Sequence, residues 1–341
     1  MQYLPLARAG RYTAVMIREG ISKVLNVSHP ARKPAQRRIV KRAGHGLLAG
    51  LLLGAAASVW ASPHASNSLD PYPSAAVAYA AVVDGGLLWG RNLDLHRAPA
   101  SLTKLLTALV VLDSNWQPDA VLPVSHAAAH ITHPRVGLHT GDTIRADDAL
   151  TAMLMHSAND ACLVLVEHAA PSMPAFAQRM NARAEQLGMR DSHFVHPCGF
   201  DAEGQYSTVN DLLLLARAAH SDPRIAQIVS QRQAAISTGK ARVLTFHNTN
   251  QLLGRLEGVM GLKTGYTAQA GHCLIAVAEQ SGHRVWLVLL DAQQRWRAAH
   301  RIITDAFAAV ARGAPARTPV RAGPRSASLS QPAFSGYPGN R

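Results

Sequence analysis

Cysteine is scarce in this chain of 341 residues, which contains only three. Cys162, Cys198 and Cys273 allow one disulfide at most, so no framework of disulfides holds the fold together. Their spacing fits neither a CxxC motif nor a zinc finger, and we expect small, buried side chains, with pairing of two of them left open. Hydrophobic residues make up 48% of the chain, which is enough for a packed core.

Long apolar runs are also lacking. The run GLLAGLLLGAAASVWA at residues 46–61 is shorter than the roughly 20 residues that span a membrane. It follows the basic stretch RKPAQRRIVKR and ends in the small residues that a signal peptidase reads. We therefore expect residues 1–61 to be a basic extension plus a signal peptide, cleaved after Ala61. The alternative is an uncleaved membrane anchor, and either one predicts an exported domain, periplasmic or facing the cell wall.

The central part of the chain has little net charge, although the whole chain carries +13. Residues 1–45 hold ten basic residues and one acid, and residues 311–341 hold five arginines and no acid. Residues 62–310 hold nineteen basic and twenty acidic residues. A nucleic-acid-binding domain needs a basic face of its own, so we expect no nucleic-acid partner. The basic ends are suited to weak contacts with anionic membrane or wall polymers.

Hydrophobic periodicity and turn signals predict an α/β (α+β) fold for residues 62–310. Strand patterns lie near both ends of this range and helical patterns lie between them. We expect an antiparallel sheet built from both chain ends, flanked by helices, with an inserted helical subdomain. The strands are expected on both sides of a hairpin turn at 84–86 and at 258–267, 272–280 and 284–292. The helices are expected at 102–112, 147–168, 174–187 and 294–309, and the tail 311–341 is expected to be disordered.

Lysine is also scarce: residues 62–310 contain three lysines against sixteen arginines. Arginine keeps its proton whereas lysine can lose it, and two of the three lysines, Lys104 and Lys263, lie in motifs where a particular amine would be needed. Lys104 lies in the stretch RAPASLTKLLTALVVL, one helical turn after Ser101 and on the same helix face. Burial would lower the pKa of this amine, and a neutral amine beside Ser101 would make the serine a nucleophile. Pro99 fits a helix start, where free N–H groups can stabilise an oxyanion.

Three further motifs carry the same residue types. The stretch STGK at 237–240 repeats the Ser-x-x-Lys pattern, but it contains a glycine and no apolar helix follows, so we predict a hairpin turn. Ser157 and Asn159 fit either an ordinary helix N-cap or a loop that brings a hydroxyl and an amide into a cleft. The stretch KTG at 263–265, on an expected strand, can bind a carboxylate and lets another backbone approach; a solvated edge strand is the alternative.

Ser-x-x-Lys, Ser-x-Asn and Lys-Thr-Gly, in this order, are the motifs of penicillin-recognising serine enzymes. The sequence resembles the low-molecular-mass penicillin-binding proteins of the D-alanyl-D-alanine carboxypeptidase family. The resemblance runs from Tyr72 to Ala309 and includes the segments VGLHTGDTI, MNARAEQLGM, YSTVNDLLLLARA and FHNTNQLL. It implies the transpeptidase fold shared by penicillin-binding proteins and β-lactamases.

The resemblance also implies the catalytic roles. Ser101 would attack the carbonyl between the two terminal D-alanines of a peptidoglycan stem peptide, and Lys104 would take its proton. Ser157 would relay a proton to the leaving D-alanine, with Lys263 nearby. Asn159 would hold the substrate amide and the amine of the base. β-Lactams would acylate the nucleophile by the same route, and no metal or organic cofactor is implied.

The substrate-binding roles follow from the same resemblance. The backbone N–H groups of Ser101 and Tyr266 would form the oxyanion hole. Thr264 would bind the terminal carboxylate, helped by Arg295, and Gly265 would let the substrate approach the strand.

The sequence departs from the family pattern at two points. Ala158 replaces a glycine that is more frequent in the second motif, which should be tolerated. After Phe307 the chain is too short and polar for the C-terminal β-domain and anchor helix of the larger carboxypeptidases. This resembles the shorter branch, which includes DD-endopeptidases that cut cross-links, so endopeptidase activity is the alternative to carboxypeptidase activity. A non-catalytic peptidoglycan-binding module is a less favoured interpretation. A β-lactamase is disfavoured because the sequence contains no Glu-x-x-Leu-Asn segment.

A histidine cluster, SHAAAHITH, invites a metal-site interpretation. His126, His130 and His133 have helical spacing and His139 follows, but the glutamate of a His-Glu-x-x-His motif is missing. Because the chain contains 17 histidines, such clusters arise readily, and we expect surface histidines without a metal.

Overall fold

The computed structural model describes residues 70–313 and 317–319. The expected basic extension, signal peptide and cleavage site at residues 1–61 lie outside the described residues, as does most of the tail. Within the described range, no helix combines the length and the apolar character that crossing a bilayer requires.

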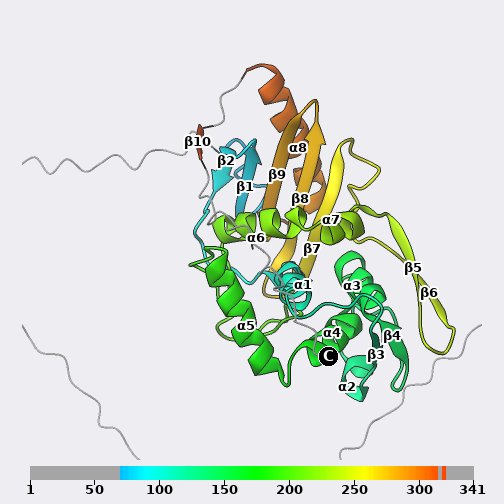
Figure 1. Ribbon diagram of the computed structural model, residues 1–341. Helices are drawn as coiled ribbons and strands as arrows, with labels where there is room; N and C mark the ends of the chain where they lie inside the picture. Colours follow the sequence, from blue (N-terminus) through cyan, green and yellow to red (C-terminus); the bar gives the residue numbers. More distant parts are fainter. Residues whose placement is uncertain (1–69, 314–316, 320–341) are drawn as a thin grey trace, which may run out of the picture. The chain divides into compact units, whose positions relative to one another are not determined.

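A six-stranded antiparallel sheet forms the centre of the domain (Figure 1), with strand order β10-β2-β1-β9-β8-β7. Its strands are β1 (Ala78–Val83), β2 (Gly86–Arg91), β7 (Val259–Thr267), β8 (Gly271–Gln280), β9 (His283–Leu290) and β10 (Arg317–Pro319). β1 pairs with β9, so strands from both parts of the chain close one sheet. This confirms the predicted sheet, and β7 is one of its two edge strands.

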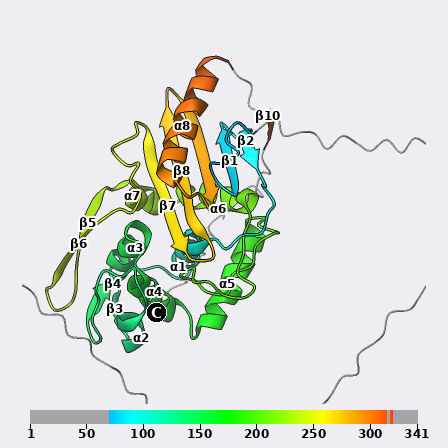
Figure 2. The same cartoon turned by 180° about the vertical axis from the view of Figure 1, so that it is seen from behind.

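Helices lie on both sides of this sheet. They are η1 (Ala100–Thr103), α1 (Lys104–Leu112), α2 (His126–His130), α3 (Ala146–Met155), α4 (Asn159–Ala169), α5 (Met173–Gln186), α6 (Val209–Ser221), α7 (Pro223–Ser230) and α8 (Arg295–Ala311). Figure 2 shows α8 across one face of the sheet, whereas α6 and the inserted helical subdomain lie on the other side. Alternate residues of β1 divide accordingly: Ala80 and Val82 join the core of the helical side, and Tyr79 and Ala81 join the core beneath α8.

Two small two-stranded sheets complete the helical subdomain. One pairs β3 (Val121–Pro123) with β4 (Thr143–Arg145), which follows α2, and the other is the hairpin of β5 (Gln233–Ser237) and β6 (Val243–His247). The second Ser-x-x-Lys match falls at the β5–β6 turn, as predicted: Ser237 ends β5, and Lys240 lies in the turn with its side chain exposed.

The helical pattern at 147–168 is interrupted where the Ser-x-Asn motif lies. α3 ends at Met155 and α4 begins at Asn159. Between them Ser157 adopts a left-handed backbone conformation with φ of +61°, which is incompatible with a continuing right-handed helix. The motif therefore occupies a loop between two helices, the cleft-forming alternative of the sequence analysis.

One open question is answered and one expectation needs correction. Cys273 is a free, buried cysteine, and the pairing that the sequence left open is a disulfide between Cys162 and Cys198. Their Cα atoms are 6.0 Å apart although 36 residues separate them in sequence, a proximity that only the tertiary fold creates. The tail is not wholly irregular, because α8 extends to Ala311 and β10 pairs with β2. Without β10, the backbone groups along that side of β2 would lack sheet partners.

Candidate active site

Ser101 lies in the short helix η1, directly before α1. The preceding residue, Ala100, has a left-handed backbone with φ of +49° and turns the chain into η1. Two glycines allow close packing around this turn. A Cβ atom on Gly199 would lie 2.1 Å from the Ala100 carbonyl oxygen, and one on Gly265 would lie 3.1 Å from the Ser101 backbone nitrogen. Gly199, which also has φ of +82°, has no room for a side chain, and Gly265 lets β7 pack closely against Ser101.

Lys104, the first residue of α1, is fully buried. Its Nζ lies 3.0 Å from Ser101 Oγ, 2.8 Å from Asn159 Oδ1 and 2.6 Å from the Cys198 carbonyl oxygen. Burial lowers the pKa of this amine well below its usual value, and the nearby charge of Lys263 lowers it further. The sequence prediction that burial would favour a neutral lysine beside Ser101 agrees with this geometry.

The contacts of Lys104 determine where its lone pair points. The Asn159 Nδ2 group donates to the Thr132 carbonyl at 2.8 Å, which turns Asn159 Oδ1 toward the lysine. Asn159 Oδ1 and the Cys198 carbonyl oxygen can only accept hydrogen bonds. A neutral amine donates its two protons to these two acceptors, and its lone pair then faces the Ser101 hydroxyl. This is the arrangement that a general base for serine requires.

A second serine–lysine pair lies beside the first. Lys263 on β7 is buried, and its Nζ donates to Ser157 Oγ at 2.9 Å and to the Thr264 carbonyl at 3.0 Å. Burial, reinforced by the positive charge of Arg295, lowers the pKa of Lys263 to about 7. A lysine with this pKa can both give and take a proton near neutral pH, and Ser157 is in position to pass that proton on.

The residues predicted to bind substrate lie at the same end of β7. Thr264 Oγ1 is 2.7 Å from Thr249 Oγ1. Arg295, the first residue of α8, donates from Nη1 to the Gly265 carbonyl at 2.8 Å and to the Cys273 carbonyl at 3.3 Å. The guanidinium therefore contacts β7 at Gly265 and adds positive charge there. Its direct contact with the terminal carboxylate of a substrate is still a prediction.

Tyr266, the next residue of β7, has an exposed side chain. Its backbone N–H follows Gly265, which packs against the Ser101 nitrogen. The two N–H groups predicted for the oxyanion hole thus come from adjoining segments. The structure brings together the nine predicted site residues: Ser101, Lys104, Ser157, Asn159, Lys263, Thr264, Gly265, Tyr266 and Arg295.

Sequence reasoning missed three neighbours of the site. The Cys198 carbonyl binds Lys104, Thr132 orients Asn159, and Thr249 contacts Thr264. Thr249 lies in the FHNTNQLL segment of the family resemblance, whereas no pattern in the sequence linked Thr132 or Cys198 to the active site. The histidine cluster forms no metal site, since the described residues contain no group of three or more His, Cys, Asp or Glu side chains able to hold a metal ion.

The fold and the site together indicate the class of protein to which the chain belongs. A serine hydrogen-bonded to a buried lysine whose pKa is lowered, a second serine–lysine pair and an edge strand beside them are the features expected of a penicillin-recognising serine peptidase. Comparison with known proteins narrows this class. The family model described as D-alanyl-D-alanine carboxypeptidase matches residues 73–294. The chain belongs to this D-alanyl-D-alanine carboxypeptidase family.

Individual relatives are named either as endopeptidases or as carboxypeptidases. The chain is 34% identical over 248 residues to a D-alanyl-D-alanine endopeptidase of Pseudomonas aeruginosa, covering 71% of this chain and 80% of that protein. It is 36% identical over 220 residues to the D-alanyl-D-alanine carboxypeptidase DacD of Escherichia coli, covering 61% of this chain and 55% of that protein. The chain thus spans little more than half the length of that carboxypeptidase.

A solved structure agrees with the fold. A mutant of the Streptomyces K15 DD-transpeptidase superposes with a TM-score of 0.66 at 27% identity, covering 69% of this chain and 98% of that one. The predicted transpeptidase fold is therefore confirmed.

Proposed function

We propose that this protein is a serine D-Ala-D-Ala carboxypeptidase that removes the terminal D-alanine from peptidoglycan stem peptides through an acyl-enzyme on Ser101. The observation that carries the proposal is the environment of Lys104: two acceptors bind its two N–H groups, and its lone pair faces the nucleophile. A non-catalytic binding module has no need of such an amine, and the geometry argues against that alternative.

Acylation follows from these contacts. As Ser101 Oγ bonds to the carbonyl carbon between the two D-alanines, its proton moves to Lys104 Nζ, and the oxyanion forms at the N–H groups of Ser101 and Tyr266. The C–N bond then breaks, and the leaving amine takes a proton from Ser157, which regains one from the Lys263 ammonium.

Deacylation requires that both lysines return to their starting states. A proton passes from the Lys104 ammonium to Lys263, which leaves Lys104 neutral. Water then attacks the ester carbon and gives its proton to Lys104, which returns it to Ser101 Oγ as the ester bond breaks. A β-lactam would follow the first half of this path and remain attached to Ser101.

DD-endopeptidase activity is a second candidate, and one observation favours it. The relative of which the chain covers 80% is named as an endopeptidase. The same residues would act, but the leaving group would belong to a second stem peptide instead of free D-alanine.

An exported location fits this substrate. Disulfides form and persist in oxidising compartments, so the Cys162–Cys198 bond supports a domain outside the cytoplasm, as expected from residues 46–61. Contacts of the basic chain ends with anionic wall polymers or membrane stay part of the proposal.

One experiment tests the activity and its alternative together. The full chain and its Ser101→Ala variant are incubated with a mixture of pentapeptide muropeptide and cross-linked dimer, and products are followed by mass spectrometry. Loss of one alanine from the monomer identifies a carboxypeptidase, and conversion of dimer to monomers identifies an endopeptidase. Unchanged substrates, or equal turnover by Ser101→Ala, would contradict the proposal.

A further inference from the structure

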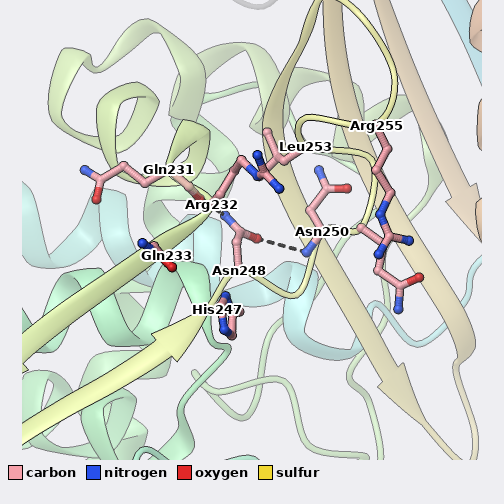
Figure 3. Close-up of a pocket in the computed structure, with 9 residues that line it drawn as sticks. Gln231, Arg232, Gln233, His247, Asn248, Asn250, Leu253 and Arg255 are labelled. Carbon is pink, nitrogen blue, oxygen red and sulfur yellow. Dashed lines mark hydrogen bonds between the residues drawn. The ribbon is translucent and has the colours of Figure 1, made fainter.

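A polar cavity of about 640 Å³ lies beside the segment that joins β6 to β7 (Figure 3). Arg232, before β5, lines it together with His247, Asn248, Asn250 and Arg255, among others. None of the described residues that line the cavity is acidic. Its lining offers two guanidinium groups and several amides, which favour a ligand that carries carboxylate and carbonyl oxygens.

The two arginines of the cavity are exposed. Within the part of the chain that the structure describes, neither Arg232 nor Arg255 forms an ion pair with a carboxylate. Asn250 is only 3% exposed, and its Oδ1 accepts a hydrogen bond from the Leu252 backbone N–H at 3.1 Å. Its Nδ2 group is buried without a hydrogen-bond partner. A buried amide donor that lacks an acceptor costs free energy unless a ligand or water supplies one.

The cavity wall is held in place by the protein itself. Asn248 Nδ2 donates to the carbonyl groups of Val229 and Gln231, at 3.1 and 2.9 Å, and its Oδ1 accepts the Asn250 backbone N–H at 2.9 Å, the contact dashed in Figure 3. Gly254 has φ of +69°, and a Cβ atom there would lie 2.9 Å from Arg232 Nε. The missing side chain leaves room for the Arg232 guanidinium beside Gly254.

The cavity adjoins the catalytic cleft through Thr249. This residue lies between Asn248 and Asn250 in sequence, and its hydroxyl is 2.7 Å from that of Thr264. In the proposed reaction the acyl carbonyl lies at the Tyr266 N–H and the leaving-group carboxylate lies at Thr264. A substrate bound along the edge of β7 therefore runs from its acyl part at Tyr266 to its leaving group at Thr264. Beyond Thr264, the leaving group points toward Thr249 and the cavity.

We propose that this cavity is a leaving-group subsite that binds the second, acidic peptide of a cross-linked substrate. Arg232 and Arg255 bind its carboxylates, and Asn250 Nδ2 donates to one of its carbonyl or carboxylate oxygens. Free D-alanine has a single carboxylate, which Thr264 binds, and nothing beyond it that reaches the cavity. In a cross-link, the leaving amine belongs to an amino acid within another stem peptide, which brings further carboxylates and amides. This subsite rests on the proposed function. It would make the enzyme prefer a cross-linked peptide to a peptide that ends in free D-alanine.

The test compares two substrates on the full chain. The Arg232→Gln/Arg255→Gln variant is measured beside wild type on cross-linked dimer, on pentapeptide monomer and for acylation by a fluorescent penicillin. The control is Arg190→Gln/Arg312→Gln, which removes the same charge from two exposed arginines that do not line the cavity. Thermal unfolding of each variant shows whether the fold is intact.

We expect kcat/KM for the dimer to fall at least about tenfold in the cavity variant, mainly through KM, as the loss of charge-assisted contacts predicts. Cleavage of the monomer and penicillin acylation should stay within about twofold of wild type, as in the control. An equal fall on both substrates, or no fall on the dimer, would overturn the subsite. Wild-type protein that cleaves monomer but not dimer would also overturn it while leaving the carboxypeptidase intact. Failure of the penicillin reaction would instead contradict the proposed function.

Discussion

The Cys162–Cys198 disulfide should contribute to both stability and catalysis. It links α4, which begins with Asn159 three residues before Cys162, to the segment whose Cys198 carbonyl binds Lys104. The bond therefore ties together the two acceptors that contact Lys104, the proposed base. Cys162→Ala/Cys198→Ala removes the bond, and Cys273→Ala, at the buried free cysteine, is the matched control.

The size of the stability effect follows from the loop that the bond closes. A separation of 36 residues corresponds to about 4 kcal/mol of lost chain entropy in the unfolded state. In a domain of this size, that loss lowers Tm by roughly 8–16 °C, measured by thermal unfolding. The acylation rate with a fluorescent penicillin, measured well below Tm, should also fall, because Lys104 loses the fixed position of one acceptor.

Two outcomes would refute this reasoning. An unchanged Tm together with an unchanged acylation rate would show that the bond contributes to neither stability nor the site. Equal losses in Cys273→Ala would show that the buried sulfur atoms, and not the bond, matter.

The remaining predictions concern the two lysines and one glycine. Lys104→Arg should abolish penicillin acylation, because arginine keeps its proton, whereas Lys240→Arg should leave it intact; substantial acylation by Lys104→Arg would remove the general-base role. The lowered pKa of Lys263, about 7 against 10.5, means that between these values the unfolded chain binds more protons, so the free energy of unfolding should rise with pH. Urea unfolding from pH 7.5 to 9 should show a smaller rise in Lys263→Met, and an identical slope would contradict a neutral buried amine. Gly199→Ala should lower Tm and acylation together, because its Cβ would lie 2.1 Å from the Ala100 carbonyl; an unaffected rate would show that this segment can shift without moving the nucleophile.

The sequence predicted those parts of the fold that local patterns determine. The hairpin at 84–86 and the three C-terminal strands follow from apolar runs bounded by glycine, and α5 stops before Gly188, which has φ of +80°. The helix break at Ser157 depended on recognising a motif, because the apolar pattern of α3 and α4 is almost continuous.

The parts that sequence could not predict depend on contacts between distant segments. Cys162 pairs with Cys198 because α4 and the 196–200 segment both pack beside Lys104, and spacing alone carries no sign of this. β10 forms because β2 offers an open edge. The family resemblance implies a role for Arg295, but its contact with the Gly265 carbonyl arises only in the folded chain.

The central claim is that Ser101 is the nucleophile and that the Ser-x-x-Lys match at 237–240 is a turn. The full chain, Ser101→Ala and Ser237→Ala are each incubated with a penicillin, and intact-protein mass spectrometry is followed by peptide mapping. The account predicts one covalent adduct, on the peptide that contains Ser101, in wild type and in Ser237→Ala, and none in Ser101→Ala. An adduct that persists in Ser101→Ala, or that maps to another residue, would contradict it.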